Sequence, residues 1–81
     1  MEHIKTYYKK ELTTPLGLVI IEGPVLPENL EKYQFDEGLV AFRPPAQQKK
    51  AVVEISKLPE GRIIIARVDD TIVGYATFLY P

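Results

Sequence analysis

The sequence contains no cysteine and no tryptophan, and it has a single histidine, His3, and a single serine, Ser56. Without cysteine there is no disulfide, no thiolate metal site and no thiol nucleophile. His3 lies near the first residue and Ser56 falls inside a predicted helix, so a paired Ser-His nucleophile is excluded. These absences remove most hydrolase chemistry.

The sequence also has no large excess of basic or acidic residues, because 10 basic and 11 acidic residues leave a net charge of −1. No apolar run approaches the roughly 18 residues that span a bilayer, and none resembles a signal peptide. We therefore expect no nucleic-acid or membrane partner and a cytoplasmic location.

The adjacent acids Asp69 and Asp70 could bind Mg²⁺ or Ca²⁺, but a two-residue turn is the favoured interpretation, so no metal site is expected.

The remaining composition is that of a small globular domain: 81 residues, 46% hydrophobic and 26% charged. The chain is predicted to be one domain, residues 1–81, of the α+β class. The expected order is β-β-α-α-β-β, with an antiparallel sheet of about four strands and two helices. The strands are predicted at residues 4–12, 18–21, 62–68 and 71–80. The helices are predicted from Pro27 to between Phe35 and Gly38, and from Pro45 to about Lys57.

Each predicted helix has an apolar side that should contact the sheet. These sides comprise Leu26, Leu30 and Tyr33 in the first helix and Ala51, Val52, Ile55 and Leu58 in the second. Residues Gln47 to Lys50 are expected to face water.

The last predicted strand is apolar on both faces, which is typical of a central strand. Strict alternation puts Val73, Tyr75 and Leu79 on one face and Ile72, Ala76, Phe78 and Tyr80 on the other. Gly74 and Ala76 leave room for a closely packed helix. One edge of this strand lacks a predicted partner, so either another chain covers it or the natural protein continues beyond Pro81. We expect a homodimer through Thr71–Tyr80, either by strand pairing or by burial of the apolar face of this strand. The expected edge residues are Thr71, Val73, Tyr75, Thr77 and Leu79.

The connector between the helices carries Phe42 and Arg43 before two prolines, and connectors often bind substrate. Phe42 and Arg43 are therefore candidate substrate-binding residues; the alternative is that Phe42 fills the core and Arg43 pairs with a carboxylate. Tyr75 and Tyr80 are further candidates, with core packing as their alternative. The glycines form no GxGxxG or GxxxxGK motif, so no catalytic, cofactor-binding or metal-binding residue is predicted.

Several segments carry a family resemblance. These are Ile21–Val25, Ala41–Pro45, Leu58–Arg67, Thr71–Tyr75 and Leu79–Pro81. The final hairpin resembles the second and third strands of the Gcn5-related N-acetyltransferase (GNAT) superfamily. Over nearly its whole length, the chain resembles the N-terminal part of the bacterial acetoin-utilisation acetyltransferases.

The resemblance implies a parent enzyme that transfers acetyl from acetyl-coenzyme A to a lysine of acetyl-coenzyme A synthetase. In that superfamily the coenzyme binds on a later strand and a glycine-containing loop, which this sequence does not contain. We therefore expect the chain to be the N-terminal, substrate-side half of such an enzyme, without bound cofactor and inactive alone. The alternative is a stand-alone, non-catalytic, dimerising interaction module.

Overall fold

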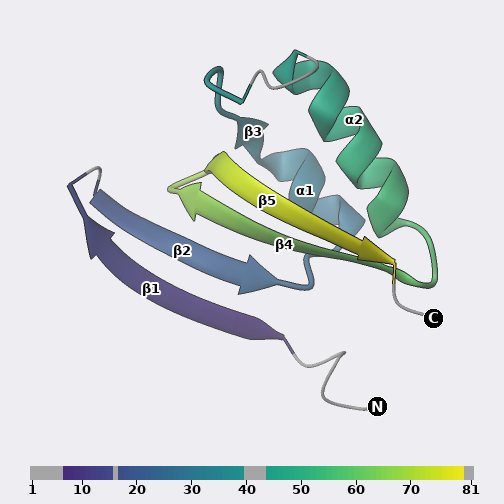
Figure 1. Cartoon of the computed structure of the whole chain (residues 1–81), viewed down its shortest axis with the longest axis horizontal. Coiled ribbons are helices and arrows are strands. Elements are labelled where there is room, and N and C mark those ends of the chain that lie inside the picture. The colour runs from purple at the N-terminus through teal and green to yellow at the C-terminus, as the bar shows by residue number, and fades with distance from the viewer. Residues whose placement is uncertain (1–6, 16, 40–43, 80–81) are drawn as a thin grey trace.

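The computed structural model describes residues 7–15, 17–39 and 44–79 of the chain (Figure 1). Its elements, in chain order, are β1 (Tyr8–Thr14), β2 (Gly17–Gly23), α1 (Pro27–Lys32), β3 (Gln34–Phe35), α2 (Pro45–Ser56), β4 (Gly61–Val68) and β5 (Thr71–Leu79). The predicted α+β class and the order of the two hairpins and two helices are confirmed. No described helix has the length and apolar content needed to cross a membrane.

The strands form a single sheet in the order β1-β2-β4-β5-β3. The four predicted strands pair antiparallel, as expected. A fifth strand, β3, pairs parallel with the start of β5, joining Gln34 to Thr71 and Phe35 to Ile72. This strand was not predicted.

The first helix is shorter than predicted because its last residues belong to β3. It ends at Lys32, and Tyr33 already has extended backbone angles of φ −93° and ψ 153°. The main chain of Gln34 then donates to the carbonyl of Asp70 over 2.9 Å. Burial of Phe35 together with these strand bonds outweighs one further helical turn.

Both helices lie on one face of the sheet, which we call the helix face (Figure 1). The described core consists of Val25, Leu30, Phe35, Val52, Val53, Ile63, Ile65 and Ile72. The prediction that Leu26 and Leu58 contact the sheet is wrong, because both side chains are exposed. Leu26 precedes α1, and Leu58 follows α2. The prediction that Gln48 faces water is also wrong, since its side chain is buried.

A break in the pairing of β5 changes which residues share a face. Arg67 pairs with Ile72 and Ala66 pairs with Gly74, so Val73 has no partner opposite it on β4. This is the geometry of a β-bulge, in which one extra residue shifts the alternation by one position. Ile72 and Tyr75 therefore both lie on the helix face, contrary to the strict alternation predicted from the sequence.

The opposite side of the sheet, which we call the open face, carries no described helix (Figure 1). It includes a shallow apolar hollow of about 200 Å³, lined by Ile21, Ile64, Ala66, Gly74 and Ala76 among others. The room that Gly74 and Ala76 leave for a helix is thus present, but α1 and α2 lie on the other face.

Candidate functional site

Tyr75 is the predicted site residue with the most specific surroundings. Its hydroxyl donates a 2.7 Å hydrogen bond to Oε1 of Gln48 on α2. Its ring lies 5.5 Å from that of Phe35, centroid to centroid, at an interplanar angle of 51°. The bulge at Val73 makes both contacts possible, because without it Tyr75 would lie on the open face.

Gln48 links this tyrosine to the segment after β3. Its side chain is 8% exposed, and its Nε2 donates to the main-chain carbonyl of Leu39. One amide therefore connects α2, β5 and the residue that directly precedes residues 40–43. Phe42 and Arg43, the two predicted connector residues, lie outside the described residues, as does Tyr80.

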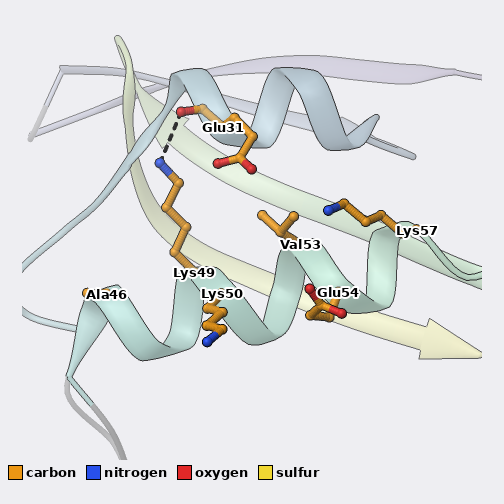
Figure 2. A pocket seen from close by; sticks show the side chains of 7 residues that line it. All are labelled: Glu31, Ala46, Lys49, Lys50, Val53, Glu54 and Lys57. Carbon is orange, nitrogen blue, oxygen red and sulfur yellow. Dashed lines mark hydrogen bonds between the residues drawn. The ribbon is translucent and has the colours of Figure 1, made fainter.

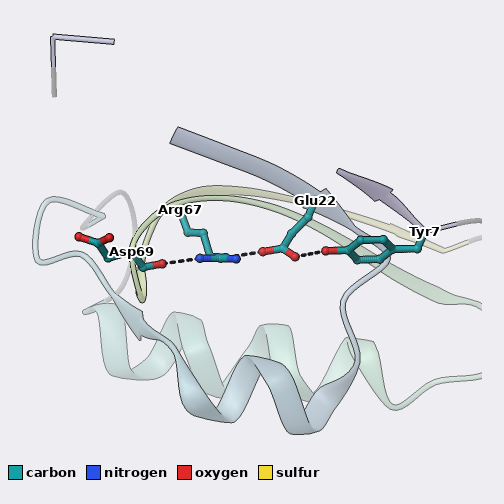
Figure 3. A network of polar contacts seen from close by, with 4 residues as sticks. All are labelled: Tyr7, Glu22, Arg67 and Asp69. Carbon is teal, nitrogen blue, oxygen red and sulfur yellow. Dashed lines mark hydrogen bonds and ion pairs between the residues drawn. The ribbon is translucent and has the colours of Figure 1, made fainter. Parts of the chain in front are cut away.

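A second polar cluster lies on the helix face, where Glu22 on β2 accepts hydrogen bonds from Tyr7 and from Nε of Arg67 (Figure 3). Nη1 of Arg67 donates to the main-chain carbonyl of Asp69 over 2.7 Å. The guanidinium also lies over the ring of Tyr33, 5.0 Å from its centroid. Arg67 thereby joins β2, the β4–β5 turn and the end of α1.

The surroundings of Glu22 set the pKa values of this cluster. Burial raises the pKa of Glu22, but the hydrogen bonds from Tyr7 and Arg67 and the charge of Arg67 outweigh it, so its pKa is lowered. The hydrogen bond to Glu22, with burial, raises the pKa of Tyr7 to about 12. Glu22 is thus held as a carboxylate, which suits a structural ion pair better than a general base near pH 7.

A shallow groove of about 330 Å³ lies beside α1 and α2 (Figure 2). Its lining residues are Glu31, Ala46, Lys49, Lys50, Val53, Glu54 and Lys57. Nζ of Lys49 donates to the main-chain carbonyl of Glu31 over 3.0 Å, which connects the two helices. Three lysines and two glutamates around a buried valine form a mixed-charge surface without a nucleophile or an orienting base.

The other sequence candidates have structural roles where they are described. The hydroxyl of Ser56 donates to the carbonyl of Val53 within α2. Asp69 and Asp70 form the β4–β5 turn, with Asp69 at φ 51°, a conformation that aspartate tolerates better than most residues. Among residues 7–15, 17–39 and 44–79, no group of three potential metal ligands comes together.

The predicted dimer-edge residues are spread over different parts of β5. Thr71 pairs with Gln34 of β3, and Val73 is the bulged residue. Thr77 and Leu79 lie farther along the strand, beyond the residues that β3 covers.

Sequence reasoning did not identify Gln48, Glu22 or Arg67 as interacting residues. Gln48 stands in a polar run, Gln47 to Lys50, that looks solvated. Glu22 and Arg67 are 45 positions apart in the chain. A weak signal was available for Glu22, which is the only charged residue in an otherwise apolar strand.

Comparison with known proteins finds relatives along the entire chain. It is 59% identical over all 81 residues to the acetoin utilization protein AcuA of Bacillus licheniformis and 58% identical to AcuA of Bacillus subtilis. It spans 39% of the length of each of these curated relatives.

A solved structure gives the same result. The crystal structure of an acetoin utilization protein from Exiguobacterium sibiricum superposes with a TM-score of 0.90 at 56% sequence identity, over 95% of this chain and 36% of that one. No protein-family model matches the sequence. All 81 residues of the chain are therefore homologous to part of the acetoin utilization protein AcuA.

Proposed function

We propose that the chain forms the substrate-side part of an acetyl-coenzyme A-dependent N-acetyltransferase of acetoin utilisation. The observation that supports this proposal is the match to AcuA proteins over all 81 residues, at 59% and 58% identity. By the family resemblance, the enzyme transfers acetyl to a lysine of a protein, and acetyl-coenzyme A synthetase is the proposed substrate. The compartment that we propose is the cytoplasm.

The described residues do not fit the coenzyme itself. A pyrophosphate group binds where main-chain N–H groups converge at a glycine-rich turn before a helix. Here α1 begins at Pro27, and α2 begins at Pro45 after Pro44, and proline has no N–H to donate. The described glycines are scattered over strands and turns, and none directly precedes a helix. We therefore assign acetyl-coenzyme A to the part of the longer relatives that this chain does not span.

The contribution of the chain would be to shape the protein-substrate side. The Tyr75–Gln48–Leu39 contacts connect the sheet to α2 and to Leu39. In the sequence, Leu39 is followed by residues 40–43, which include the proposed substrate contacts Phe42 and Arg43. Tyr75 is 36% exposed, so part of its ring remains accessible to a substrate. We propose that this cluster positions the acceptor segment and takes no part in proton transfer.

A chimera tests this proposal. Residues 1–81 would replace the matching segment of Bacillus subtilis AcuA, and release of the coenzyme A thiol would be measured with acetyl-coenzyme A synthetase as acceptor. We expect a rate within about tenfold of the parent, because the two segments are 58% identical. A folded chimera without activity would contradict the proposal; unmodified AcuA is the matched control.

The 81-residue chain alone supplies the second measurement. Isothermal titration with acetyl-coenzyme A at about 100 μM should show no binding, and the chain should show no transferase activity. Micromolar binding would contradict the assignment of the coenzyme to the missing part. The alternative function is a stand-alone, non-catalytic, dimerising interaction module, and an inactive chimera together with a folded chain that does not bind the coenzyme would support it.

A further inference from the structure

The hydrogen bonds of Gln48 determine which way its side-chain amide points. Its Nε2 donates to the main-chain carbonyl of Leu39, and a carbonyl oxygen can only accept. The other end of the amide, Oε1, therefore lies toward Tyr75. Gln48 is buried, so a rotation that exchanged the two ends would place two accepting oxygens against each other away from water. The main chain after β3 thus sets the orientation of this amide.

The orientation of the amide determines what the Tyr75 hydroxyl can do. A tyrosine hydroxyl has one proton to donate and lone pairs that accept. The proton of Tyr75 is used in the 2.7 Å hydrogen bond to Oε1 of Gln48, which can only accept. Among the residues that the structure describes, Tyr75 has no second hydrogen-bond partner. Any further group that binds this hydroxyl oxygen must therefore be a hydrogen-bond donor.

The ring of Tyr75 adds a preference for positive charge. It contacts the buried ring of Phe35, and 36% of the Tyr75 residue is exposed. The faces of aromatic rings attract cations within about 6 Å. β5 itself carries no charged residue from Thr71 to Leu79, so no cation of this strand competes for the ring. An ammonium group, which has three N–H donors, a positive charge and no acceptor, matches both the ring and the hydroxyl oxygen.

We propose that the hydroxyl oxygen of Tyr75 accepts a hydrogen bond from the ammonium group of the acceptor lysine, with the tyrosine ring against the charge. Gln48 is a positioning residue, because it acts on the substrate only through the tyrosine proton that it holds. This inference rests on the proposed function, in which the acceptor is a lysine of a protein. The contact holds the substrate before transfer and removes no proton from it.

A carboxylate or a carbonyl suits this position poorly. Both groups only accept, so they would face the lone pairs of Tyr75 unless its proton left Oε1 of Gln48, a buried acceptor. The lysine contact itself should be weak, because one hydrogen bond at a partly exposed side chain leaves the ammonium mostly hydrated. We therefore expect a dissociation constant in the millimolar range for an isolated amine.

An NMR titration of the AcuA chimera with small probes tests the preference for a donor. The chimera contains isotope-labelled tyrosine, and the signal that disappears in Tyr75→Phe identifies Tyr75. The probes n-butylammonium, n-butanol and n-butyrate share one apolar chain but carry a cationic donor, a neutral hydroxyl and an anionic acceptor. We expect n-butylammonium to shift the Tyr75 signal with a dissociation constant of about 10 mM and n-butyrate to bind about tenfold more weakly. Equal affinity for n-butylammonium and n-butanol, or tighter binding of n-butyrate, would overturn the proposal.

Steady-state kinetics of the chimera give a second readout. Tyr75→Phe removes the accepting oxygen and should raise the KM for acetyl-coenzyme A synthetase about fivefold, with the KM for acetyl-coenzyme A unchanged. Gln48→Met keeps the tyrosine but releases its proton, and it should raise the same KM about threefold. Tyr8→Phe removes an exposed hydroxyl on β1 and is the matched control, with both KM values unchanged. A purely structural loss would reduce the amount of active enzyme without raising the KM for one substrate alone.

The lysine contact and the proposed function can fail separately. An active chimera in which Tyr75→Phe leaves the KM for the acceptor unchanged refutes the lysine contact and leaves the transferase assignment standing. An active chimera in which Gln48→Met behaves as wild type refutes the positioning role of Gln48. A folded but inactive chimera that still binds n-butylammonium in preference to n-butyrate at Tyr75 contradicts the proposed function and supports the ammonium preference.

Discussion

The two faces of the sheet are similar in composition and very different in burial. Along β4, Ile63 and Ile65 point to the helix face and are 0% and 1% exposed, whereas Ile64 between them points to the open face and is only half-buried. Leu30, Val52 and Val53 from the helices cover the first two. Three consecutive isoleucines thus have the same side chain but unequal burial. An apolar run in a strand therefore does not specify which face of the sheet the helices pack against.

Alanine substitutions at Ile63 and at Ile64 should give the largest difference in the free energy of unfolding. Ile63→Ala removes a fully buried side chain and leaves a cavity, which should lower the free energy of unfolding by about 2–5 kcal/mol. Ile64→Ala removes a partly buried side chain, and we expect a loss of about 1 kcal/mol. Urea unfolding followed by circular dichroism measures both. Equal losses would show that the open face is as well packed as the helix face.

Removal of the Glu22–Arg67 ion pair on the helix face should have the next largest effect on the free energy of unfolding. Glu22→Gln removes the charge that Arg67 faces, and we expect a loss of about 1–3 kcal/mol in the free energy of unfolding. Glu11→Gln, at an exposed position of β1, is the matched control and should change it by less than about 0.5 kcal/mol. If the two variants unfold at the same urea concentration, the Glu22–Arg67 pair does not stabilise the fold.

The lowered pKa of Glu22 predicts that the stability of the fold depends on pH. Because the pKa of folded Glu22 is lowered, its contribution is fully present above the unfolded pKa, near the ordinary value of 4.5, and is lost as the pH falls through the folded value. The stability difference between wild type and Glu22→Gln should therefore be constant from pH 7 to about pH 5 and shrink below about pH 4.5. A difference that stays constant down to pH 3 would contradict the lowered pKa.

Removing or adding one hydroxyl group on β5 should have the smallest effect on the stability of the fold. Tyr75→Phe removes the hydrogen bond to Gln48 on the helix face and should cost about 1 kcal/mol. Phe78→Tyr adds a hydroxyl on the exposed open face and should change stability by less than about 0.5 kcal/mol. Thermal unfolding of both variants checks this expectation; a larger change at Phe78 would mean that the open face is covered in solution.

The sequence was sufficient for the elements that depend on local signals. Proline at the first helical position located the starts of α1 and α2, and the apolar runs around Asp69 and Asp70 located the final hairpin. β3 could not be predicted in this way, since two residues have no periodicity and their strand conformation depends on pairing with β5. The end of α1 was therefore placed too late.

The candidate site was predictable only in part. Tyr75 was chosen as an aromatic residue near a possible cleft, but its partner Gln48 is 27 positions away and resembled its solvated neighbours. The exposure of Leu26 and Leu58 was missed because both extend an apolar helical spacing past the helix end. Such errors arise where tertiary packing decides the outcome of a local pattern.

The bulge at Val73 makes the length of β5 as important as its composition. Deleting this one residue would restore strict alternation and leave the later faces unchanged, because Gly74 would then follow Ile72 directly and Tyr75 would stay opposite Ile65 on the helix face. Deleting a paired residue such as Ala76 would instead exchange the faces of Thr77, Phe78 and Leu79, so the effect of a one-residue deletion in β5 depends on whether it removes the bulged residue or a paired one.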